Sequence, residues 1–128
     1  PNYVKCFVDD CGYTSVWDQF RKELKEDFGI PAFPILYTSS WLCDLTKGWN
    51  FTEASSLEQV KKCQLPMLFI HGDKDDYVPT WMVYELYKAK PEPKELWTVP
   101  NADHAISYKL NKQEYTDKVK QFTDKYIR

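Results

Sequence analysis

The clearest pattern in the sequence is an apolar run at residues 67–70, which contains no polar residue and lies between Pro66 and Gly72. Such a short run is typical of a strand that is buried on both faces, as strands in parallel sheets are. Further strand candidates occur at residues 4–8 and 95–99. The pattern therefore predicts about three parallel strands.

Between and after these strands, apolar residues recur at helical spacing. Residues 16–28 place apolar side chains on one face and charged ones largely on the other, and we expect Gly29 to end this helix. A second helix follows Pro79 and closes before Pro91, and an amphipathic helix at about residues 112–127 covers the sheet. Alternation of strands and helices without an internal repeat predicts an α/β fold.

Residues 30–43 differ from the other helical segments because they are apolar nearly all round and rich in aromatic side chains. A helix that began at Pro34 would need cover on most of its sides. A short helix, capped by Ser55 or Ser56, leads from this segment into the strand at residues 67–70.

The chain of 128 residues is long enough for a single domain, which buries about two-thirds of its extended-chain surface. We divide it into a strand and loop at residues 1–13, a helical insertion at residues 14–63, and a segment at residues 64–128 with two strands, each followed by a helix. The sequence begins without Met and reaches a strand pattern within three residues of Pro1, so we interpret it as a piece cut from a longer protein.

Composition excludes several classes of function. The net charge is −2, with acidic and basic residues spread along the chain, so the sequence has no basic stripe for nucleic acid. No apolar run approaches the roughly 18 residues of a membrane span, so we expect no membrane association. The four cysteines lack C-x-x-C spacing and only two histidines accompany them, which argues against a zinc site and favours a cytoplasmic location.

Candidate chemistry lies at the ends of two predicted strands. Asp75 follows the strand at residues 67–70, and His104 follows the strand at residues 95–99. The C-terminal ends of adjacent parallel strands meet at one sheet edge, where open α/β sheets build their active sites. The chain thus brings an acid and a histidine together, in that chain order, as the acid–base half of a Ser-His-Asp triad requires.

Two motifs around these residues resemble the α/β-hydrolase family, and within it the serine hydrolases related to bacterial esterases and prolyl-oligopeptidase-type peptidases. HGxxDxxVP at residues 71–79 resembles the acid loop of that family, and ADH at residues 102–104 resembles its histidine loop. The resemblance extends over nearly the whole chain and implies the C-terminal portion of an α/β-hydrolase fold. It also implies that Asp75 orients His104, which acts as general base.

The nucleophile of that family lies upstream in a G-x-S-x-G turn, and none of the four glycines here pairs with a serine in that pattern. Ser39 and Ser40 fall within a predicted helix, which lacks the strained turn that exposes a catalytic hydroxyl. We therefore expect the chain to supply the aspartate and the histidine, but not the serine, of a hydrolase that cleaves ester, amide or peptide bonds, and to be inactive alone. We expect no cofactor and no metal ion.

In the resembling family, an insertion at the position of residues 14–63 lies over the site as a cap and shapes the substrate pocket. The resemblance thus makes four aromatic residues candidates for substrate binding: Phe33, Tyr37, Trp41 and Trp49. At helical spacing, such side chains more often belong to the core, and both interpretations stay open.

Two other functions remain as alternatives. The pattern Asp73-x-Asp75 after an apolar run is similar to metal-assisted phosphoryl-transfer motifs, although in those motifs the first aspartate ends the strand directly. The chain would otherwise be a non-catalytic α/β domain or a binding module.

The resemblance also implies that the strand at residues 4–8 lacks one neighbour, since the matching strand of the family is paired on both sides. An unpaired apolar strand edge promotes association. We therefore expect an oligomer, a strand-exchanged dimer or a bound partner.

Overall fold

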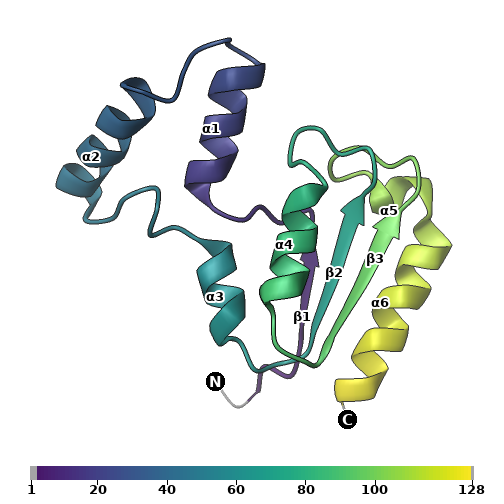
Figure 1. Cartoon of the computed structure of the whole chain (residues 1–128). Helices are drawn as coiled ribbons and strands as arrows, with labels where there is room; N and C mark the ends of the chain where they lie inside the picture. The colour runs from purple at the N-terminus through teal and green to yellow at the C-terminus, as the bar shows by residue number, and fades with distance from the viewer. Residues whose placement is uncertain (1–2, 128) are drawn as a thin grey trace.

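The computed structural model describes residues 3–127 as three parallel strands with helices on both faces of the sheet (Figure 1). The strands are β1 (Phe7–Asp10), β2 (Met67–Gly72) and β3 (Lys94–Val99). Their order in the sheet is β1-β2-β3, so β2 is central. The predicted α/β class with about three parallel strands is confirmed.

The helices lie in three groups around this sheet. Those of the described residues are α1 (Val16–Glu26), α2 (Ile35–Lys47), α3 (Ser56–Lys62), α4 (Trp81–Ala89), α5 (Ser107–Leu110) and α6 (Lys112–Tyr126). In Figure 1, α3 and α4 lie on one side of the sheet and α6 on the other, while α1 and α2 extend away from it.

β2 is buried on both faces because its side chains alternate between two apolar clusters. Leu68 and Ile70 pack toward Phe122 of α6. Phe69 faces the opposite way and packs with Val83 of α4. This double burial explains why the sequence of β2 shows no polar alternation.

β1 occupies Phe7–Asp10 rather than the predicted residues 4–8. The amide of Phe7 donates to the carbonyl oxygen of Pro66 at 2.9 Å, and the ladder with β2 continues through Asp9 and Asp10. Aspartate is a poor strand former, but pairing with a buried neighbour outweighs that preference. The strand therefore carries two carboxylates to the edge at which the candidate site lies.

Two serines begin helices as N-caps. The Ser15 hydroxyl accepts from the Asp18 amide at 3.0 Å at the start of α1, and the Ser55 hydroxyl accepts from the Glu58 amide at 3.2 Å at the start of α3. Ser55 rather than Ser56 is thus the cap of the short helix. Ser15 and Ser55 also pair in an isolated antiparallel bridge, which joins the starts of the two helices.

α2 is exposed on most of its surface, whereas its apolar composition predicts cover on most sides. Within residues 3–127, only Leu36 and Ser40 of this helix are buried, whereas Trp41, Leu42 and Leu45 are exposed. No helix in this part of the chain, α2 included, is both long and apolar enough to cross a bilayer.

Candidate active site

Asp75 lies in the turn that follows β2, and its side chain is buried. Its Oδ1 accepts a hydrogen bond from the Val78 amide at 2.8 Å, and its Oδ2 accepts one from His104 Nδ1 at 2.8 Å. The backbone bond fixes the carboxylate within the turn and leaves the second oxygen for the histidine. The structure thus brings together the two residues that the strand-end argument paired.

The loops after β2 and β3 lie directly against each other. The amides of Asp73 and Lys74 donate to the carbonyl oxygens of Val99 and Ala102, both at 3.1 Å. Gly72 permits this approach, because a Cβ at that position would lie 2.1 Å from the Ala102 oxygen. Backbone packing, rather than the two catalytic candidates themselves, therefore sets the distance between the loops.

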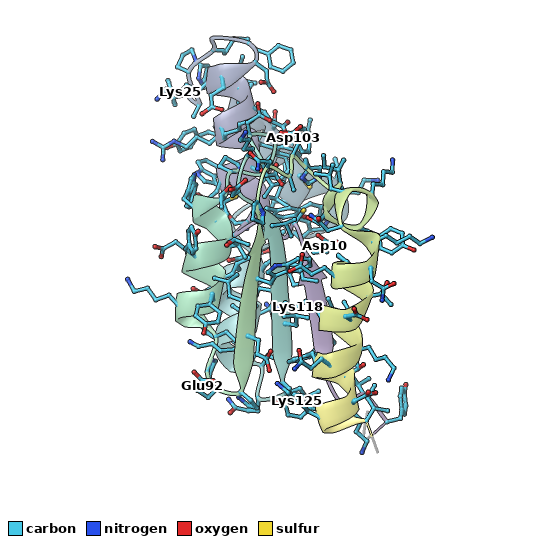
Figure 2. The ribbon with its side chains drawn as sticks, turned by 90° about the vertical axis from the view of Figure 1, so that its right-hand side faces the viewer. Asp10, Lys25, Glu92, Asp103, Lys118 and Lys125 are labelled. Atoms are coloured by element: carbon cyan, nitrogen blue, oxygen red, sulfur yellow. The ribbon has the colours of Figure 1, made fainter. Side chains whose placement is uncertain are left out.

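His104 follows Asp103, which Figure 2 labels at the upper edge of the sheet, far from Glu92 at the opposite edge. Because a carboxylate only accepts, His104 Nδ1 carries the proton in its bond with Asp75, and Nε2 of the neutral ring can accept another. The His104 side chain is 34% exposed, and the Tyr77 ring packs beside it with a centroid separation of 4.9 Å. The histidine is therefore an oriented base that solvent and small molecules can reach.

His71 is a second histidine beside this pair, and it is fully buried. Its Nε2 lies 2.8 Å from the Val78 carbonyl oxygen and 3.4 Å from Asp75 Oδ2. Since a carbonyl oxygen only accepts, Nε2 carries the proton and holds the turn that contains Asp75. His71 therefore holds the turn around the carboxylate and does not reach the surface.

Three buried side chains are close enough to form a metal-binding group. One donor atom each of Cys11, His71 and Asp75 lies within 4.8 Å of the others. Both Asp75 oxygens already accept from protein groups, and His71 Nε2 donates its proton to the Val78 carbonyl oxygen. We therefore assign no metal-binding role to them.

A cavity of about 310 Å³ opens beside His104. Its walls come from the loop after β1, from one face of α1 and from the turn that contains Asp75, and they are formed by Cys11, Tyr13, Val16, Gln19, Phe20, Glu23, Tyr77, Val78 and His104. A second cavity of about 290 Å³, mainly apolar and lined by α1 and α2, shares Phe20 and Glu23 with the first. The two cavities therefore adjoin along α1.

The four aromatic residues proposed for substrate binding do not line the cavity at His104. Phe33, Tyr37, Trp41 and Trp49 lie on or beside α2 and are exposed. Tyr37 instead packs edge-on against Trp17 of α1, with a centroid separation of 4.9 Å. Contact of these four residues with a substrate stays a prediction.

Sequence reasoning missed the cavity wall that α1 provides through Val16, Gln19 and Phe20. Their helical spacing was the available signal, and it showed only that they share one face of a helix. Which surface that face meets depends on the direction in which the chain leaves β1. Helical periodicity carries no information about that direction.

Ser39 and Ser40, the two serines considered above as nucleophiles, do not line the cavity at His104. Ser40 is buried on α2, where its hydroxyl accepts from the Phe51 amide at 3.1 Å. Within residues 3–127, no serine is among the side chains that line the cavity at His104.

Electrostatics at the end of β1 differ between its two carboxylates. Asp10 accepts a hydrogen bond from the Tyr115 hydroxyl at 2.8 Å. Burial raises the pKa of Asp9 from 3.8 to about 6, although the nearby His71 acts in the opposite direction. Asp9 lies outside the cavity that His104 lines.

The profile of the prolyl oligopeptidase family (Peptidase_S9) matches residues 5–128. The chain belongs to the prolyl oligopeptidase family. The match to the family includes Asp75 and His104 together with the elements that carry them.

Individual proteins are similar to the chain in sequence or in structure. The uncharacterized protein YqkD of Bacillus subtilis (strain 168) is 32% identical over 118 residues, which are 92% of this chain and 39% of YqkD. The esterase Pf2001 of Pyrococcus furiosus has a similar structure, with a TM-score of 0.66 and 20% identity over 98% of this chain and 45% of the esterase. The α/β hydrolase MGS-MChE2, from a sediment metagenome of the Mar Chica lagoon, gives a TM-score of 0.60 and 14% identity over 95% of this chain and 51% of that enzyme.

These structural likenesses concern the fold, and they show that the chain has the fold of the C-terminal part of an α/β hydrolase, as expected. The chain spans about two-fifths of YqkD and about half of the two solved enzymes.

Proposed function

We propose that this member of the prolyl oligopeptidase family supplies the aspartate and the general base of a serine hydrolase that cleaves an ester, amide or peptide bond. One observation is central: His104 Nδ1 lies 2.8 Å from the buried Asp75 carboxylate, while the same ring lines an open cavity. Membership of the family and the structural likeness to an esterase support the proposal.

In the proposed mechanism, His104 Nε2 accepts the proton of a serine hydroxyl as the serine oxygen attacks the carbonyl carbon of the substrate. The resulting imidazolium then donates this proton to the leaving group. Asp75 keeps the proton on Nδ1 and stabilises the imidazolium as it forms. Val78 and His71 hold the carboxylate in the required position.

The serine is proposed to lie outside this sequence, which has no G-x-S-x-G pattern. Relatives such as YqkD, of which the chain spans 39%, carry enough further sequence for a strand and turn that would bear it. The chain alone is proposed to lack turnover, because loss of one member of a triad removes nearly all of its rate acceleration.

The volume of the cavity beside His104 favours a small substrate. Its volume of about 310 Å³ lies at the lower end of the range of roughly 300–1,000 Å³ that is common for small-molecule sites. Val16 and Phe20 give it an apolar wall, and Glu23 adds a carboxylate. We propose that one side of a small ester, amide or short peptide occupies this space.

The metal-assisted alternative is weaker, because the carboxylates of its motif hold the two loops together. Asp73 Oδ1 accepts from the Asn101 amide at 2.7 Å, and both oxygens of Asp75 are hydrogen-bonded. The labelling and hydrolysis experiment described next distinguishes the non-catalytic alternative from the proposal.

The test uses a fluorophosphonate, which forms a covalent adduct with an activated serine, and a chromogenic acetate ester. We expect the full-length protein to react with both. His104→Ala should lower the rate of ester hydrolysis by about 10⁶-fold, because the proton acceptor is lost, and Asp75→Asn should lower it by about 10⁴-fold, because the correct tautomer is lost. Asp76 is exposed in the same turn, so Asp76→Asn is the matched control and should retain the rate of the unaltered protein.

The isolated chain of 128 residues should fold and remain unlabelled. An adduct on this chain that disappears in His104→Ala would place the nucleophile within it and would contradict an external serine. If the full-length protein hydrolyses the ester at the same rate with His104→Ala and with Asp75→Asn as without them, the proposed roles are refuted. A folded full-length protein without labelling or hydrolysis would support the non-catalytic alternative.

A further inference from the structure

Cys11 is a buried residue whose backbone conformation is unfavourable for a side chain. It directly follows β1, has a φ of +59° and is 6% exposed. Left-handed conformations of this kind suit glycine, because a Cβ approaches the carbonyl oxygen. Yet Gly12 lies one position later, and the cysteine occupies the strained position. Backbone strain next to a candidate site raises the question of what the side chain does there.

The Cys11 sulfur joins the loop after β1 to the loop that carries His104. The Ala105 amide donates to Cys11 Sγ at 3.4 Å, and the thiol donates to Asp10 Oδ1 at 3.2 Å. The other oxygen of Asp10 accepts from the Tyr115 hydroxyl of α6 at 2.8 Å. Figure 2 shows Asp10 near the end of the sheet on the side where α6 lies. A continuous chain of hydrogen bonds therefore runs from α6 to the residue after His104.

The backbone conformation of Ala105 is one that a hydrogen bond from its amide would help to hold. This residue also has a left-handed backbone, with a φ of +56°, and it directly follows His104. A change in the φ of Ala105 would turn the chain that carries the His104 ring. The ring itself makes one hydrogen bond to the protein among the described residues, the bond to Asp75.

We infer that Cys11 is a positioning residue for His104: its thiol accepts from the Ala105 amide, donates to Asp10 and so holds the His104 loop in the orientation that directs Nδ1 at Asp75. This role rests on the proposed function, because it concerns the geometry of the proposed base. Asp10 and Tyr115 extend the same anchor to α6.

The chemistry of the thiol fits an anchor better than a nucleophile. Burial raises the pKa of Cys11 to about 12, so its sulfur keeps its proton at neutral pH. Burial likewise raises the pKa of Tyr115 to about 12. Both groups therefore donate to the Asp10 carboxylate, whereas a cysteine nucleophile requires the thiolate.

The experiment observes His104 directly in the chain of 128 residues, through the NMR signal of its Nδ1–H proton. Cys11→Ala removes the sulfur, and Cys11→Gly removes it while also relieving the left-handed strain. In both variants the exchange of this proton with water should become about fivefold faster, the factor expected when one ordinary hydrogen bond no longer holds the loop closed. Cys11→Ser, which keeps a donor and an acceptor, should restore most of the protection.

The matched control is Cys43→Ala on α2, which removes a thiol outside the cavity and should leave the His104 signal unchanged. Tyr115→Phe should shift the exchange rate in the same direction as Cys11→Ala by a smaller factor, since it removes the far end of the anchor. Thermal unfolding of each variant separates a local change at His104 from a general loss of structure.

Unchanged exchange of the His104 proton in Cys11→Ala and Cys11→Gly would overturn the inference. A Cys11→Ser variant that behaves like Cys11→Ala would also overturn it, since the sulfur would then act through its volume. The measurement involves no turnover, so its failure is distinct from that of the proposed function. If the full-length protein is an active hydrolase and the Cys11 substitutions do not change the exchange of the His104 proton, this inference alone is refuted.

Discussion

Asp9 and Asp10 are neighbours in sequence, but their carboxylates differ in hydrogen bonding. Asp10 receives hydrogen bonds from Tyr115 and Cys11. Asp9 faces the other side of the sheet, where a Cβ on Gly12 would lie 2.3 Å from its Oδ1. Its Oδ2 has no hydrogen-bond partner within residues 3–127. Burial is therefore the main reason why the pKa of Asp9 rises to about 6.

Asp9→Asn should stabilise the chain at neutral pH more than in acid. The pKa of Asp9 rises from 3.8 to about 6 on folding, so the charged form favours the unfolded state. Stability is consequently lost as the pH increases from about 4 to about 6, and the substitution should recover on the order of 1–3 kcal/mol above that window.

Urea unfolding of both proteins at about pH 4 and about pH 7.5 measures this difference. Comparison across pH cancels the cost of burying an amide, which is the same at both values. An equal effect of the substitution at the two pH values would contradict the raised pKa.

At the residue scale, the sequence predicted that Asp75 and His104 meet, and it missed most of their surroundings. Asp75 and His104 were predictable because parallel strands deliver their C-terminal loops to one edge, whatever the details of packing. The contact of Cys11 with Ala105 joins residues far apart in sequence and depends on two left-handed backbones. No periodicity or motif signals such a contact.

At the element scale, the order and type of the strands and of the longer helices followed from sequence, while the short helix α5, the bounds of β1 and the cover of α2 did not. The start of β1 is set by its register against Met67 of the buried central strand. Such pairing is a property of two segments, whereas propensity is read from one. For α2, apolar composition indicated burial, but composition cannot show whether another surface is present to provide it.

The two faces of α2 should respond differently to the same substitution. Leu36 is 2% exposed and Leu45 is 64% exposed. Leu36→Ala should therefore lower the free energy of unfolding by about 2–4 kcal/mol through lost burial and a residual cavity. Leu45→Ala, its matched control on the same helix, should change it by less than about 0.5 kcal/mol.

Urea unfolding of the two variants under one set of conditions gives both values. Comparable losses would mean that the outer face of α2 is covered in solution by another copy of the chain or by a further segment of the protein.

At the scale of the whole molecule, the open edge of β1 is the most consequential surface. β1 pairs with β2 on one side and with no other strand of the described residues. Phe7 and Val8, whose side chains point to opposite faces of the sheet, are 42% and 39% exposed. Both faces are therefore incompletely covered next to this edge, and we propose that a strand of a second copy or of a partner pairs there.

This proposal predicts that the isolated chain associates as its concentration increases. Val8→Lys should shift the population toward monomer, because a charge on an edge strand opposes pairing with another strand. Ile127→Lys adds the same charge at an exposed position just after α6 and should have no such effect. Light scattering coupled to size-exclusion chromatography measures the mass, and a monomer at every concentration would contradict pairing with a second copy and leave a partner strand as the occupant.

The hydrogen bonds between the loops after β2 and β3 have a consequence for how catalysis would begin. Asp73 and Lys74 bond to the backbone of the histidine loop, and Gly72 lets the two backbones meet without a side chain between them. The conformational entropy of orienting Asp75 and His104 is therefore lost when this chain folds, and not when a substrate arrives. The pair is preorganised, so an incoming serine and carbonyl group would need to order only themselves.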